Sequence, residues 1–95
     1  MSSNEFQSIE KEDIVKCHFP DEEVLKDASE RKTRQFELDR AIALGNLEHF
    51  KVKIFFTDDK GKKVVNTTIW AITDKAILLK QNVIVPIHRI IKLEI

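Results

Sequence analysis

Apolar and polar residues alternate with a period of two along the second half of the chain, and this pattern predicts closely spaced β-strands. Between residues 49 and 56, alternation places Phe50, Val52, Ile54 and Phe56 on one side, which is expected to face the core. Phe55 falls on the opposite side, so it is expected to face solvent unless the helix or another chain covers it. The expected strands are Phe50–Phe56, Lys63–Ile72, Ile77–Lys80 and Val83–Ile95.

Short polar segments separate these strands. Residues 58–62 give a tight connection in which Gly61 is able to take the positive φ that a hairpin loop requires. The segment Lys63–Ile72 is rich in β-branched residues, which favours a long central strand that bends strongly, with Trp70 in the core. Pro86 lacks a backbone N–H, so it marks a break in the last strand or an edge position.

The period changes in the first half of the chain. Residues 21–45 fit a period of 3.6 better and predict one helix or two short consecutive helices. Asp21 is expected to cap the first turn, and Gly45 with Asn46 to end the helical segment. Residues 14–19 form a short apolar stretch, either an extra strand or a packed arm, and residues 1–13 are expected to be flexible.

These elements indicate one α+β domain over residues 14–95, helical at 21–45 and β at 49–95. Its four or five strands are expected to form a strongly bent antiparallel sheet or a small barrel. A chain of 95 residues is long enough for one hydrophobic core and too short for two.

The order of elements and three segments resemble the SH3-like and Sm-like small β-barrels. The segments are Val52–Phe56 with the turn after it, Asp74–Lys80, and Ile87–Ile90. The chain is similar to the bacterial Sm-like RNA chaperones in its aspartate-led strand and in His88, with Ile87 where that family carries a lysine. In element order it also resembles the Rho-binding antiterminator family. The resemblance covers residues 30–95 and implies a regulatory module that contacts RNA or a protein of the transcription and RNA machinery.

Composition and motifs narrow the functional classes. Apolar residues make up 42% of the chain and charged residues 34%, which is typical of an ordinary globular domain. The opening residues lack the features of a signal peptide and no apolar stretch has the length of a membrane span, so a cytoplasmic location without membrane contact is expected. Cys17 is expected to be a half-buried apolar residue rather than a nucleophile. We expect no enzyme, cofactor or metal site, because no known catalytic or metal-ligand motif is visible.

Charge is distributed unevenly although the net charge is zero. Residues 1–47 carry a net charge of −4 and residues 48–95 a net charge of +4. Either the basic half meets an anionic partner, or the two halves attract each other within one fold.

The candidate anion-binding residues are the basic side chains of the β half. They are Lys51, Lys53, Lys62, Lys63, Lys80, His88 and Arg89. Exposed lysines also protect sheet edges from aggregation, so the same pattern fits a purely structural role. Alternation points His88 and Arg89 to opposite sides, which argues against both binding one anion and favours a structural role for the pair.

Two functional hypotheses follow. The first is a non-catalytic module that binds RNA or a regulatory protein through its basic β half. The second is a protein-interaction domain that self-associates through the C-terminal strand, with Phe55 as a partner surface. Binding of nucleic acid should weaken steeply as salt rises, whereas strand pairing should persist. A pocket uniting Cys17, His18 and His88 would instead favour an enzyme.

Overall fold

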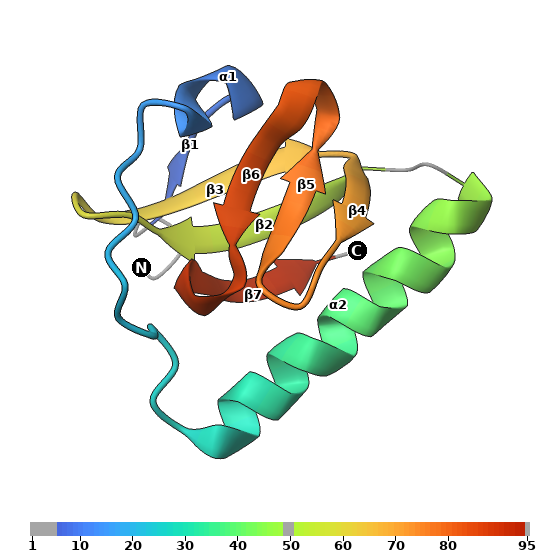
Figure 1. Ribbon diagram of the computed structural model, residues 1–95, viewed down its shortest axis with the longest axis horizontal. Coiled ribbons are helices and arrows are strands. Elements are labelled where there is room, and N and C mark those ends of the chain that lie inside the picture. Colours follow the sequence, from blue (N-terminus) through green and yellow to red (C-terminus); the bar gives the residue numbers. More distant parts are fainter. Residues whose placement is uncertain (1–5, 49–50, 95) are drawn as a thin grey trace.

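Two small sheets face each other across the hydrophobic core, and one long helix packs beside them (Figure 1). The computed structural model describes residues 6–48 and 51–94, and for residues 44–48 it describes the backbone alone. The helices are α1 (Lys11–Ile14) and α2 (Ala28–Glu48), and 3₁₀ turns occur at η2 (Lys80–Asn82) and η3 (Ile87–Arg89). The strands are β1 (Gln7–Ser8), β2 (Val52–Thr57), β3 (Lys62–Thr67), β4 (Ile69–Ile72), β5 (Ala76–Leu79), β6 (Val83–Pro86) and β7 (Ile90–Glu94).

Sheet A has the strand order β1-β3-β2-β7, and sheet B has the order β4-β5-β6. Strand β1 pairs with β3 in parallel, and the other neighbours are antiparallel. The chain passes between the sheets twice, from β3 to β4 through Thr68 and from β6 to β7 through η3. The α+β class is therefore confirmed, while the two sheets remain separate and do not close into a barrel.

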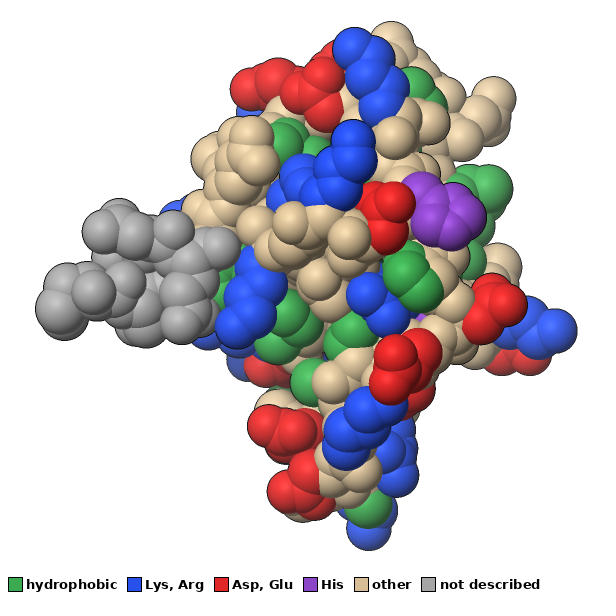
Figure 2. All heavy atoms as spheres, turned by 90° about the vertical axis from the view of Figure 1, so that its left-hand side faces the viewer, with side chains coloured by type: hydrophobic (Ala, Val, Ile, Leu, Met, Phe, Trp, Pro, Cys, Tyr) green, Lys and Arg blue, Asp and Glu red, His purple; other side chains and the backbone are tan. Residues whose placement is uncertain are grey.

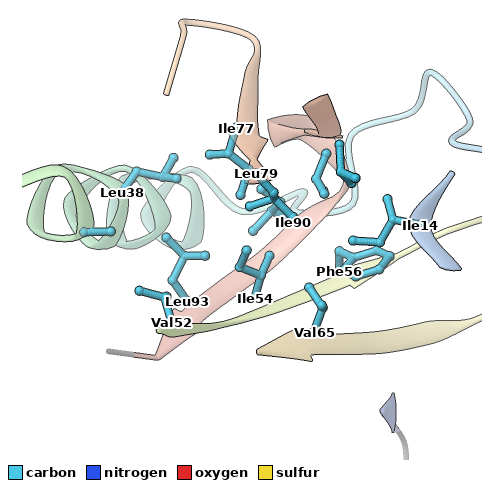
Figure 3. Close-up of a cluster of buried hydrophobic side chains, with 13 residues drawn as sticks. Ile14, Leu38, Val52, Ile54, Phe56, Val65, Ile77, Leu79, Ile90 and Leu93 are labelled. Atoms are coloured by element: carbon cyan, nitrogen blue, oxygen red, sulfur yellow. The ribbon is translucent and has the colours of Figure 1, made fainter. Parts of the chain in front are cut away.

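The core lies between the inner faces of the two sheets (Figure 3). Val52, Ile54 and Phe56 point inward from β2, as their alternation predicts, and are at most 3% exposed. Residues of β5 and β6 meet them from sheet B, and α2 adds Leu38 and Ala41. Phe50, which alternation also predicts to face the core, lies outside the described residues.

The predicted start and end of the helical segment are wrong. Helix α2 begins at Ala28 rather than Asp21, and Asp27 accepts a hydrogen bond from the Ser29 N–H at 3.0 Å, in the manner of a capping residue. Residues 21–27 are not helical and pack against the β half of the chain instead, where the Val24 N–H donates to the His88 carbonyl at 2.9 Å. The helix also continues through Gly45 and Asn46 to Glu48.

The strand boundaries differ from expectation in two places. The segment Lys63–Ile72 bends strongly, as predicted, but it splits at Thr68 into strands of different sheets. The segment from Val83 is interrupted by η3 directly after Pro86, which confirms a break at that proline. Ile95 lies outside the described residues.

Trp70 is 65% exposed, so its prediction as a core residue is wrong. The pairing of β4 with β5 shifts register between Ile69 and Ala71, so Trp70 is the extra residue of a β-bulge. Ile69 and Ile72 pack against the core on either side of it. The prediction rests on the preference of large aromatic residues for the cores of small domains, whereas alternation from core-facing Ile69 places Trp70 outward.

The N-terminal segment is more ordered than expected. Within residues 6–13, which were expected to be flexible, β1 pairs with the edge of β3 and α1 begins; residues 1–5 lie outside the described part of the chain. Ile14 is buried in α1, and Phe19 packs on Phe56 with ring centroids 5.8 Å apart. Residues 14–19 are accordingly the packed arm, not the extra strand.

Candidate functional site

The outer face of sheet A carries a groove of about 580 Å³. Because side chains alternate along a strand, the residues that line it are those that point away from the core. They are Phe6, Ser8, Lys53, Phe55, Val64, Asn66, Lys92 and Glu94. We refer to these eight residues as the sheet A groove. It combines aromatic, amide and ammonium groups supplied by four strand regions of the sheet.

Phe55 lies at the centre of the groove. In the strand register it is opposite Val64 on β3 and Lys92 on β7. The ring of Phe6 meets it edge to face, with centroids 4.9 Å apart and an interplanar angle of 80°. Phe55 therefore points away from the core, as alternation predicts, and Phe6 of the N-terminal segment covers part of its ring.

Lysines surround the two rings. The Lys92 ammonium lies 4.8 Å from the Phe55 centroid, and the Lys62 ammonium lies 5.8 Å from the Phe6 centroid. Lys53 is exposed beside them, and Lys92 also forms an ion pair with Glu94 at 3.1 Å, both about half exposed. Three lysines, Lys53, Lys62 and Lys92, therefore lie near the rings with one carboxylate, Glu94, which leaves a local net charge of +2. Lys51 is exposed just before β2.

Lys63 points to the other side of sheet A, toward buried Asp58, so it does not join the groove. Its ammonium lies 3.0 Å from the Asp58 carboxylate, and its side chain is only 14% exposed. Burial by itself would raise the pKa of Asp58, but hydrogen bonds from the Lys60 N–H and the Lys63 ammonium outweigh burial and hold that pKa at about 2. The candidate role of Lys63 as an exposed anion ligand does not match this geometry.

Arg89 is buried, and its donors are engaged within the fold. The guanidinium donates to the backbone carbonyls of Glu22 at 2.7 Å, Thr57 at 3.1 Å and Asp58 at 3.5 Å. His88 Nε2 lies 2.9 Å from the Pro20 carbonyl oxygen. Both side chains hold residues 20–22 against the β-sheets, and neither is presented to an external anion as the sequence suggested.

Lys80 lies in η2, between β5 and β6, and so belongs to the sheet B side of the molecule. It is exposed but does not line the groove on sheet A. Figure 2 shows the side of the molecule that is on the left in Figure 1, where basic side chains are interspersed with acidic and apolar ones. Of the seven candidate basic residues, Lys53 lines the groove, Lys62 borders it through Phe6, and Lys51 precedes β2.

Cys17 is half buried, as expected. Burial, reinforced by the nearby Asp58 carboxylate, raises the pKa of its thiol to about 11, which leaves little thiolate for nucleophilic chemistry at neutral pH. Its neighbour His18 is exposed, while His88 is bound to Pro20. Among residues 6–48 and 51–94, no three His, Cys, Asp or Glu side chains are grouped in a way that suits a metal ion.

The comparisons with known proteins identify no family. Models of protein families, curated proteins and solved structures gave no match to this chain. In the part of the chain that the structure describes, every helix is too short or too polar to cross a membrane.

Sequence reasoning missed Phe6, Asn66 and Lys92. Alternation with Leu93 and with Val65 signals that Lys92 and Asn66 point outward, and the strand register then brings them to the groove. Phe6 has no such signal, because it lies far away along the chain in a segment that was expected to be flexible.

Proposed function

We propose that the sheet A groove binds single-stranded nucleic acid, with RNA as its ligand, and that the protein acts as a binding module without catalysis. The single observation that carries the proposal is the position of Phe55, whose ring lies in an open groove between lysines. Aromatic rings on a basic sheet face are the usual means by which small β-proteins hold unpaired bases.

Each part of the groove has a counterpart in a nucleotide. A base has a flat apolar face that stacks on Phe55 or Phe6, and stacking of this kind contributes about 1–3 kcal/mol per base. Phosphates carry the charge that Lys53, Lys62 and Lys92 complement. Asn66 and Ser8 offer hydrogen-bonding groups at the rim for base edges or 2′-hydroxyls.

We also propose that the two sheets are the halves of an open small barrel of the SH3-like or Sm-like type. Three features support this view: β3 leads directly into β4, a 3₁₀ turn precedes the last strand, and β7 returns to pair with β2. Helix α2 packs beside β7 and β4. In this arrangement the groove is the outer surface of one barrel wall.

Self-association through the C-terminal strand has less support from the geometry. The outer edge of β7 lies against α2, where the Leu93 N–H donates to the Glu37 carboxylate at 3.0 Å. Arg34 of the same helix donates to the Ile90 carbonyl at 2.9 Å. These two contacts occupy part of the edge that another strand would need for pairing.

The proposal is tested by fluorescence anisotropy with a labelled single-stranded RNA of mixed sequence, titrated at several salt concentrations. With three phosphate contacts, the slope of log K against log salt should be about −2, since each contact to a single strand contributes about −0.7. Replacing Lys53 or Lys92 with Gln should reduce the slope by about 0.7. Phe55→Leu keeps most of the volume but removes the ring, and should weaken binding roughly tenfold.

Lys80→Gln is the matched control, because it removes the same charge from an exposed site on the other sheet. It should leave both affinity and salt slope unchanged. Absence of binding by the wild type at low salt would refute the proposal. So would an affinity that falls equally in Lys80→Gln and Lys53→Gln, because that result would indicate a general charge effect without a defined groove.

A further inference from the structure

Sheet B is apolar on both of its faces. Its inner face contributes Ile77, Leu79, Val83 and Val85 to the core. The outward positions, given by alternation and by the bulge in β4, are Trp70, Ala71, Ala76, Leu78, Ile84 and Pro86. None of these six residues, which we call the sheet B face, carries a charge or a hydrogen-bonding group apart from the Trp70 indole N–H.

Such a composition is unusual for a sheet with one face in water. Antiparallel sheets that are solvated on one side normally alternate apolar and polar residues, as the outer face of sheet A does with Lys53, Asn66 and Lys92. Strands that are apolar on both sides are typical of sheets buried on both sides. The sheet B face nevertheless leaves Trp70 65% and Ile84 53% exposed.

The strand register aligns three of these side chains in one row across the sheet. Ala71 pairs with Leu78, and Leu78 pairs with Ile84, so the row crosses all three strands. The bulge places Trp70 and Ala71 next to each other between Ile69 and Ile72, which both pack on the core, so Trp70 and Ala71 both lie on the outer side. A tryptophan at the end of an apolar row is the kind of side chain that carries most of the binding energy in protein interfaces.

We propose that the sheet B face is the contact surface of a weak homodimer, in which two copies pack these faces against each other about a two-fold axis. A two-fold contact brings a surface against itself, so a surface with an excess of one charge repels its own copy. The sheet A groove has such an excess, whereas the sheet B face is uncharged. In the turns that join its strands, Asp74 and Lys75 offset each other and Lys80 adds one positive charge, while Glu23 and Arg34 beside Ala76 and Pro86 form an ion pair with each other.

The size of the face sets the strength of the dimer. With Trp70 supplying on the order of 150 Å² and the other five side chains less, two copies would bury roughly 800 Å² in total. This lies below the range of about 1,200–2,000 Å² for stable specific interfaces and among weak, transient ones, so the dimer is populated only at high protein concentration. The inference does not depend on nucleic-acid binding, because it uses the other sheet.

Sedimentation velocity of the full chain, without RNA, tests the proposal between about 10 µM and about 1 mM protein. The wild type should sediment as a monomer at the low concentration and shift toward a dimer at the high one. Ile84→Lys places two ammonium groups in the contact and should weaken association at least tenfold. Trp70→Gln removes the aromatic ring without adding a charge and should also weaken association.

Phe36→Lys is the matched control, because Phe36 is 62% exposed but lies on α2 and does not belong to the sheet B face. It should associate like the wild type, and circular dichroism checks that each variant is folded. A wild type that stays monomeric at about 1 mM would overturn the proposal. Equal loss of association in Ile84→Lys and Phe36→Lys would overturn it too, as would a folded Ile84→Lys that dimerises normally.

Discussion

The ion pair of Arg34 and Glu23 offers a sharp test of how the helix is held to the sheets. The guanidinium donates two parallel hydrogen bonds to the carboxylate, at 2.8 and 2.7 Å, and a third to the Ile90 carbonyl at 2.9 Å. The Arg34 side chain is 7% exposed and that of Glu23 is 29% exposed. Replacing Glu23 with Gln leaves the Arg34 charge buried without a countercharge, which should destabilise the fold.

The magnitude follows from the pKa of Glu23. The hydrogen bonds from Arg34, opposed by burial and helped by the Leu25 N–H, lower this pKa from 4.5 to about 2. A difference of that size corresponds to about 3 kcal/mol at neutral pH, and screening of the partly exposed carboxylate reduces our expectation to about 2 kcal/mol. This loss of unfolding free energy is measured by urea titration monitored by far-ultraviolet circular dichroism, because exposed Trp70 is a poor fluorescence probe of the core.

The dependence on pH has a defined sign. Because the folded pKa of Glu23 is depressed, its contribution is present above the unfolded pKa and is lost as pH falls through the folded value. The gap in unfolding free energy between the wild type and Glu23→Gln should therefore shrink between about pH 5 and pH 2.

Glu22→Gln is the control, because Glu22 pairs with Lys26 at 2.7 Å with both side chains about 70% exposed, and it should change stability little. A gap below about 0.5 kcal/mol for Glu23→Gln at pH 7, or a gap that persists unchanged at pH 2, would refute the reasoning.

Three further predictions concern the core, one turn and the thiol. Leu38→Ala should lower the unfolding free energy by about 3 kcal/mol in urea titrations, because it opens a cavity in the core between α2 and the sheets, and a loss below about 1 kcal/mol would contradict this packing. Gly61→Ala should lower the unfolding free energy by about 1 kcal/mol, because alanine is strained at φ +149°. No heavy atom lies within 4 Å of the added Cβ, so a steric clash does not contribute, and an unchanged urea midpoint would show that the turn has another conformation. Cys17 should react with iodoacetamide at pH 8 on the order of a hundredfold more slowly in the folded protein than in urea, because its pKa is raised to about 11, and equal rates would disprove the burial of the thiol.

The sequence predicts the local pattern of the β half better than its boundaries. Alternation identifies Val52, Ile54 and Phe56 as core residues because β2 lies centrally in its sheet, with one face buried throughout. The preference of large aromatics for the core fails at Trp70, which is exposed, and alternation fails one residue later, where the bulge turns Ala71 outward. The helix start fails for a different reason, because tertiary bonds to His88 and Arg89 keep residues 22–24 out of the helix despite their local capping signal.

The candidate site was predictable only in part. Lys53 and Phe55 follow from the alternation in β2, but the sequence does not reveal that Lys92 of β7 and Phe6, which precedes β1, complete the same surface. Charge counting also treats all cations alike. Arg89 and Lys63 appear in the sequence as equal members of a basic half, yet the fold uses both inside the molecule.

The contacts between α2 and the edge of β7 also determine how readily the protein aggregates. Because the Leu93 N–H bonds a glutamate of the helix rather than a neighbouring strand, the edge is shielded only while the helix is docked. Partial unfolding that releases α2 would expose Leu38 and the edge of β7 together, and strands of other molecules could then pair with that edge. The kinetic resistance of this protein to aggregation therefore depends on the lifetime of one helix on its sheet, and hydrogen exchange at the Leu93 amide would report that lifetime directly.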